Sequence, residues 1–81
     1  MHQLLNEPID VDVTFRGKRI HPNRIHWEQR VYTMTNVNLV HQAHEGKKRI
    51  FYFSVSDRTN FMKLRFDPEL LEWKLVELYT D

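Results

Sequence analysis

Hydrophobic and polar residues alternate most clearly in the middle of the chain, between Lys47 and Asp67. Residues 49–56 are rich in β-branched and aromatic types and contain neither Gly nor Pro, which indicates a strand. Residues 57–60 are four consecutive polar residues and predict a turn. From residue 61 the alternation restarts with the period of two that a half-buried strand requires. This stretch therefore predicts a hairpin around which the rest of the chain is organised.

The period of two divides the side chains of this hairpin between two faces. The residues expected to face the core are Phe51, Phe53, Val55, Met62, Leu64 and Phe66. The residues expected on the outer face are Ile50, Tyr52, Ser54, Phe61, Lys63 and Arg65. The outer face thus mixes aromatic and basic side chains.

Further strand patterns precede the hairpin. Residues 9–15 alternate cleanly, and Gly17 supplies the positive φ of a tight turn. Pro22 and the residue after it are expected to end the return strand early, whereas residues 1–7 have no period and are expected to fray. Beyond this point, residues 24–44 predict three more strands. The alternation changes phase near Thr35 to Asn38, which predicts a bulge or a bend at Asn36.

The segment after Asp67 supports two interpretations. Its first residues, Asp67-Pro68-Glu69, are typical of a helix start, and a helix from Pro68 to Tyr79 would make the domain α+β. As a strand, it would place Leu71, Trp73 and Leu75 inward. The strand is favoured, because a helix would leave Trp73 and Val76 among polar residues.

These elements predict an all-β fold. We expect residues 1–81 to form one domain, a small antiparallel sheet of about six or seven strands rolled into a barrel or a two-layer sandwich. The chain has no Cys, so neither disulfides nor a Cys-based zinc site is expected. It has no apolar run of the ~18 residues that span a membrane and no signal-peptide pattern, so a cytoplasmic location is the default expectation.

Charge is unevenly distributed along the chain. Residues 1–15, 16–65 and 66–81 carry net charges of −3, +8 and −4, although the whole chain carries only +1. Acidic and basic segments of this kind can pair across a sheet. They can also make one face positive enough to attract a polyanion.

The stretches GKRIHPNRIHWEQRVYTM, KRIFYFSVSD, FMKLRFD and EWKLVELYTD resemble a family of small uncharacterised bacterial β domains. Such domains also occur at the C-terminal end of some Y-family polymerase-like proteins of bacterial mutagenesis systems. The matching positions are Pro22, Trp27, Tyr32, Tyr52, Leu64, Trp73, Leu75 and Tyr79. The chain departs from the family by lacking a Gly after Trp27 and in the turn at residues 57–60. The resemblance implies a β fold and a setting near nucleic acid.

The chain offers little for catalysis. It has no Cys nucleophile, no Gly-rich phosphate loop and no GxSxG motif, so we expect no enzyme activity and no cofactor. His41, His44 and Glu45 have an HxxHE spacing, but on a strand the two rings would lie on opposite sides. We therefore expect no metal site there.

Two binding functions remain. The first is binding of single-stranded nucleic acid, in which cations follow the phosphates and bases stack on exposed rings. Its candidate residues are Arg16, Lys18, Arg19, Lys47, Lys48, Arg49, Tyr52, Phe61, Lys63 and Arg65. The second is an interaction with another protein or a second copy of this chain, through an exposed sheet edge and an apolar patch that includes Ile50.

Overall fold

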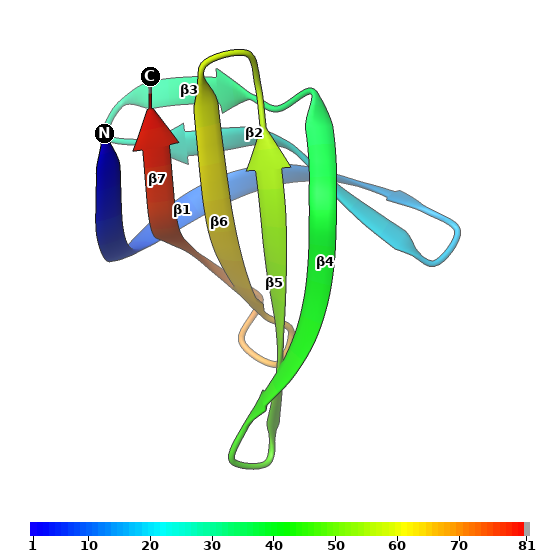
Figure 1. Cartoon of the computed structure of the whole chain (residues 1–81). Coiled ribbons are helices and arrows are strands. Elements are labelled where there is room, and N and C mark those ends of the chain that lie inside the picture. Colours follow the sequence, from blue (N-terminus) through cyan, green and yellow to red (C-terminus); the bar gives the residue numbers. More distant parts are fainter. Residues whose placement is uncertain (81) are drawn as a thin grey trace.

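The computed structural model describes residues 1–80, which form seven β-strands and no helix (Figure 1). The strands are β1 (His2–Arg16), β2 (Arg19–Trp27), β3 (Arg30–Thr33), β4 (Asn36–Glu45), β5 (Lys48–Ser56), β6 (Asn60–Asp67) and β7 (Glu72–Thr80). The all-β prediction is confirmed. The segment after Asp67 forms a turn and β7, so the alternative with a C-terminal helix is wrong.

All neighbouring strands are antiparallel, and they form one sheet in the order β3-β2-β1-β7-β6-β5-β4. The long strand β1 joins two layers, because His2–Ile9 pairs with β7 whereas Asp10–Arg16 pairs with β2. Figure 1 shows β2 and β3 running across behind the strands β4 to β7. The sheet is therefore rolled, but it does not close, since its edge strands β3 and β4 do not pair.

The hydrophobic core fills the space between these two layers. Its buried members are Ile9, Ile25, Met34, Phe53, Val55, Met62, Leu64, Phe66, Leu75 and Leu78. Trp73 packs against this cluster, with its ring centroid 4.5 Å from that of Phe66 and 5.3 Å from that of Phe53. Burial of such large side chains contributes about 1.5–3 kcal/mol each, so this cluster is the main source of stability.

The central hairpin has the predicted turn and register. Phe53 lies opposite Leu64, and the core-facing residues of β6 are all buried. In the turn, the Asp57 Oδ1 accepts backbone N–H bonds from Thr59 at 2.9 Å and from Asn60 at 2.7 Å. The aspartate thus fixes a chain reversal that contains no glycine.

The N-terminal part of the chain differs from the expectation in two ways. β1 starts at His2 rather than near residue 8, because β7 supplies a partner for its first residues. β2 also continues through Pro22, with an unpaired extra residue at Asn23. Counting outward from the two-residue turn after Arg16, the pair Val13–Pro22 belongs to the non-hydrogen-bonded class, so the missing N–H of Pro22 removes no bond to β1.

Two inward or outward assignments in the second half are wrong. Leu71 is 75% exposed, because it lies in the turn before β7 with φ +55°. A bulge at Val76 then turns both Leu75 and Leu78 toward the core. Ile50, expected on the exposed face, has no exposed surface at all.

The bulge expected near Asn36 lies instead at Asn38. Val37 pairs with Val55 and Leu39 with Ser54, which leaves Asn38 without a partner in β5. The phase change lies within the predicted range, from Thr35 to Asn38, and the bulge lies two residues after Asn36.

Candidate functional site

The outer face of β5, β6 and β7 carries a row of rings and one cation stacked on a ring. The Lys63 Nζ lies 5.1 Å from the centroid of the Tyr52 ring. Phe61 packs edge-on against Tyr79 at 5.8 Å, and Tyr79 stacks on His2 at 3.9 Å. Tyr52, Phe61 and Lys63 thus share one side of the sheet, as the alternation predicts.

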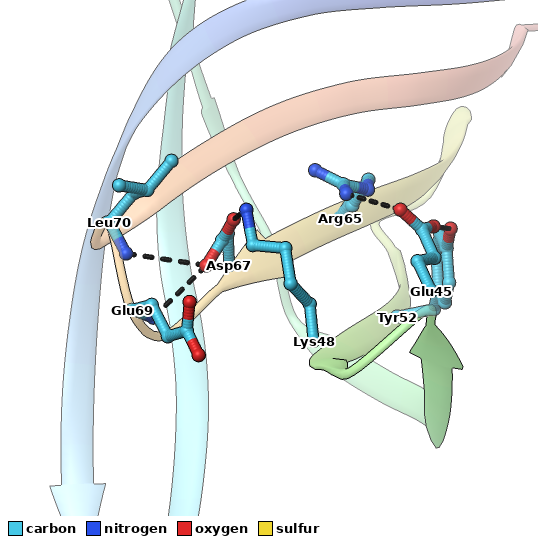
Figure 2. A network of polar contacts seen from close by, with 7 residues as sticks. All are labelled: Glu45, Lys48, Tyr52, Arg65, Asp67, Glu69 and Leu70. Atoms are coloured by element: carbon cyan, nitrogen blue, oxygen red, sulfur yellow. Dashed lines mark hydrogen bonds and ion pairs between the residues drawn. The ribbon is translucent and has the colours of Figure 1, made fainter.

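Arg65 on this face is neutralised by an acid. Its Nη2 lies 2.6 Å from Glu45 Oε1, and the Tyr52 hydroxyl donates to Glu45 Oε2 at 2.8 Å (Figure 2). The hydrogen bond from Arg65, followed by that from Tyr52, lowers the pKa of Glu45. Burial and the adjacent Glu45 raise the pKa of Tyr52. The three side chains form a closed polar group, which leaves the guanidinium of Arg65 little capacity for a phosphate.

Lys48 is neutralised in the same way. Its Nζ lies 2.7 Å from Oδ2 of the buried Asp67, whose Oδ1 accepts the backbone N–H groups of Glu69 at 3.0 Å and Leu70 at 3.3 Å (Figure 2). The hydrogen bond from Lys48 is the largest of the effects that lower the pKa of Asp67. Lys48 and Tyr52 are the neighbours of Ile50 on the same side of β5. Ile50 is fully buried, although it is not a member of the main core cluster.

A cleft of about 990 Å³ opens on another side of the domain, where the sheet fails to close. One wall is the β1–β2 hairpin, which projects past β4 in Figure 1, and the other wall is the first half of β4. Its lining residues are Thr14, Arg16, Lys18, Arg19, Ile20, His21, Asn23, Thr35, Asn36, Val37, Asn38, Leu39, Val40, Phe51 and Phe53. The lining contains three cations and no acid.

Two unpaired strand edges border this cleft. At its inner end, the Met34 N–H donates to the Asn23 carbonyl at 2.8 Å, and the next residue, Thr35, donates its N–H to the Ser56 carbonyl at 3.0 Å. The chain thus crosses from the edge of β2 to the edge of β5 at this point. Beyond it the two edges diverge, because β2 pairs with β3 only over Arg24–Trp27 and β4 pairs with β5 alone.

The pairing pattern shows which backbone groups face the cleft. In an antiparallel pair, hydrogen-bonded and non-hydrogen-bonded positions alternate, and a two-residue turn is flanked by a hydrogen-bonded pair. Counting from the pair Glu45–Lys48, Val40 and Phe53 form a non-hydrogen-bonded pair. The N–H and C=O of Val40 therefore point to the free edge. By the same count from Arg16–Arg19, those of Ile20 do so on the opposite wall.

The cleft also exposes apolar side chains beside these free backbone groups. Leu39 and Val40 are 60% and 51% exposed, and Phe51 is half-buried at the floor. Arg16, Lys18 and Arg19 are exposed at the tip of the opposite hairpin, and none of them forms an ion pair within residues 1–80. The cleft thus offers unpaired backbone, apolar surface and free positive charge together.

The structure distributes the ten predicted site residues over three places. Arg16, Lys18 and Arg19 line the cleft; Tyr52, Phe61, Lys63 and Arg65 lie on the outer face; and Lys47, Lys48 and Arg49 lie at the turn between β4 and β5. They do not form one surface. The free edge of β4 was not among the predicted sites. Its signal in the sequence is the exposed pair Leu39-Val40, two adjacent apolar residues in a strand that is otherwise largely polar.

His41 and His44 lie on opposite sides of β4. His41 pairs with Tyr52 on the outer face, whereas His44, three residues later, pairs with Arg49 on the opposite face. Within residues 1–80, no group of three or more His, Cys, Asp or Glu residues has a metal-binding arrangement.

No helix within residues 1–80 is long and apolar enough to cross a lipid bilayer. A comparison of the chain with protein-family models, curated proteins and solved structures found no match.

Proposed function

We propose that this chain is a non-catalytic protein-interaction domain that receives an extended segment of a partner protein beside β4. The observation that carries the proposal is the free edge of β4, which opens into the cleft with the Val40 backbone groups unpaired. A strand added to such an edge gains main-chain hydrogen bonds, and pockets for alternate side chains give it specificity.

The cleft allows a strand to dock on the β4 edge without exposing a long, flat edge to other chains. Of β4, only residues 36–40 line the cleft, so the docked segment would pair with about the first half of this strand. The opposing β1–β2 hairpin limits access to this half, which restricts indiscriminate edge-to-edge pairing of the kind that leads to aggregation. The domain therefore keeps one edge open in a protected place.

Selection from a displayed library of random decapeptides tests the proposal. We expect Val40→Pro to weaken binding of the selected peptides by about tenfold, because it removes a donor that the added strand uses and leaves the β4–β5 ladder intact. Gln42→Pro is the matched control, since Gln42 occupies the next non-hydrogen-bonded position of the same strand but lies outside the cleft. Equal binding by the two variants would refute edge docking, as would a library that yields no binders.

Self-association through the same edge is a separate outcome of this proposal. Sedimentation of the wild-type chain at micromolar concentration distinguishes it from partner binding. A dimer that Val40→Pro converts to a monomer would identify the second copy of the chain as the occupant.

Binding of single-stranded nucleic acid is a second candidate function. The observation in its favour is the position of Lys63 on the Tyr52 ring beside Phe61, since rings and cations on one sheet face can hold bases and phosphates. Fluorescence anisotropy with a labelled oligo-dT at two salt concentrations tests it. Absence of binding at the lower salt concentration would exclude this function, and loss of binding in Lys63→Glu but not in Val40→Pro would support it.

A further inference from the structure

We infer that the segment which docks in the cleft is acidic, with carboxylates directed at Arg16, Lys18 and Arg19 and apolar side chains directed at the floor. This inference rests on the proposed function and adds the chemistry of the partner. It starts from the charge of the lining, which contains three cations and His21 but no Asp or Glu.

The three cations are available to a ligand. Every ion pair within residues 1–80 that involves Lys or Arg lies elsewhere, at Arg24–Asp12, Lys48–Asp67 and Arg65–Glu45. Arg16 and Arg19 are cross-strand partners at the end of the hairpin, and Lys18 lies in the turn that joins them. Like charges this close repel one another, so an anion that lies between them relieves repulsion as well as gaining attraction.

The backbone favours a peptide over a nucleic acid as that anion. The groups that face the cleft from Val40 and Ile20 are amide N–H donors and carbonyl acceptors, which an extended peptide matches at its own spacing. Stacking of bases needs exposed ring faces. The lining has only two aromatic residues, the buried Phe53 and the half-buried Phe51, and both form part of the floor.

The geometry also specifies a pattern for the segment. Side chains of an added strand alternate between two faces, so every second residue would cover Val37, Val40 and Phe51 and is expected to be apolar. The cations lie at the end of β2 that is farthest from the crossing at Asn23 and Met34. The acids are therefore expected toward the part of the segment that leaves the cleft at its mouth.

A second copy of this chain fits this pattern poorly. Among residues 1–80, the longest unpaired strand edge is that of β4, whose sequence NVNLVHQAHE contains one acid, Glu45, and that acid already binds Arg65. The other acidic parts that the structure describes lie at residues 1–15 and 66–80, and they are built into the sheet as β1, the turn after β6, and β7. The expected occupant is an acidic segment of a different protein.

The peptides selected against the wild-type chain provide the test. We expect them to contain more Asp and Glu than the input library, with apolar residues at alternate positions. Replacing one acid of the best peptide by its amide should weaken binding about two- to fivefold at low salt. The triple variant R16Q/K18Q/R19Q should bind the acidic and amide peptides equally.

A second triple variant, K47Q/R49Q/R58Q, controls for long-range attraction. It removes the same charge from exposed residues that do not line the cleft and form no ion pair within residues 1–80. It should therefore retain the preference for acidic peptides. Equal loss in both triple variants would overturn the inference.

The outcomes separate this inference from the proposed function. If the selected peptides have no excess of acids but Val40→Pro still weakens their binding, the inference of an acidic partner would be refuted and edge docking would be supported. If Val40→Pro and Gln42→Pro bind the selected peptides equally, both edge docking and the acidic partner would be refuted. A different result would assign the cleft to nucleic acid and overturn the inference. In that case oligo-dT would bind more tightly than the best peptide, and its binding would be lost in R16Q/K18Q/R19Q but retained in Val40→Pro.

Discussion

The outer face and the cleft both carry cations, but the two regions differ in what surrounds them. On the outer face, Arg65 and Lys48 each contact a carboxylate at 2.6 and 2.7 Å. In the cleft, Arg16, Lys18 and Arg19 have no acid among the lining residues. The count of basic residues in a segment therefore does not indicate where an anion binds. The relevant property is whether the fold supplies its own counter-charge.

The two regions are therefore also expected to differ in their contributions to stability and to binding. On the outer face, the paired side chains bridge β4, β5, β6 and the following turn, and Ile50 between Lys48 and Tyr52 is fully buried, so this region belongs to the folded structure. In the cleft, the three cations form no ion pair within residues 1–80, and the backbone groups of Val40 and Ile20 that face it are not paired in the sheet. Variants of the outer face should therefore change the free energy of unfolding, and variants of the cleft should change affinity.

The largest expected effect comes from the side chain beneath the outer polar groups. Ile50→Ala should lower the free energy of unfolding by about 2–5 kcal/mol, because it removes a fully buried side chain from a site with little room to collapse. Urea denaturation followed by tryptophan fluorescence measures this change.

Leu39→Ala is the control for this prediction. Leu39 is 60% exposed at the cleft, so its truncation should change the unfolding free energy by no more than about 0.5 kcal/mol. If the two variants are equally stable, the outer face is not part of the folded core and the comparison between the regions fails.

The next largest effect is expected at acidic pH, which should lower the stability that the paired carboxylates provide. Hydrogen bonds from Arg65 and Lys48 lower the pKa values of Glu45 and Asp67, and those from His26 and Arg24 lower that of Asp12, below their ordinary values of 4.5 and 3.8. The unfolded chain therefore takes up protons at higher pH than the folded one. These groups stabilise the fold above their unfolded pKa values, and this contribution disappears as the pH falls through the folded values.

Thermal melts between pH 7 and pH 2 measure this effect, with the steep part of the loss expected below about pH 5. R16Q/K18Q/R19Q should give the same acid profile, because no carboxylate faces these cations. A profile that becomes flat in the triple variant would show that the cleft cations are paired after all.

The fold was predictable where local pattern and tertiary packing agree. The alternation of residues 49–66 and the polar turn at Asp57 determine the central hairpin, and both are properties of short stretches. The prediction was wrong where pairing or burial depends on residues outside the local stretch. Residues 2–7 have no period of their own and are ordered by β7, and Ile50, whose neighbours on its side of β5 are polar, is nevertheless fully buried in the folded chain.

The candidate site was predictable in composition but not in arrangement. Sequence identified the cations of the two Gly turns and the outer-face residues, yet the alternation along one hairpin cannot show that Glu45 reaches Arg65 or that Arg16 lies across a cleft from Val40. The strand order decides which edges stay free. That order depends on how β1 bends between the two layers, which no local pattern encodes.

A smaller effect is expected from the ring and cation pair on the outer face. A double-mutant cycle with Tyr52→Leu and Lys63→Met should give a coupling of about 0.5–1 kcal/mol, the usual value for an exposed cation over a ring. Denaturation of the four proteins in the cycle measures the coupling. A value near zero would mean that Lys63 is free of Tyr52 and available to an anion. The outer face would then resemble the cleft in having a cation without a stabilising contact.

The smallest change in stability is expected from the three cleft cations together. R16Q/K18Q/R19Q should alter the unfolding free energy by no more than about 0.5 kcal/mol, because these side chains are exposed and form no ion pair with residues 1–80. Any small change should be a gain, since relief of repulsion between the cations favours the fold. Three positive charges that cost nothing in stability when removed, yet determine which peptides are bound, would be the clearest evidence that the cleft exists for a ligand. A loss as large as that of Ile50→Ala would instead place these cations in the folded structure, and the distinction between the two regions would no longer hold.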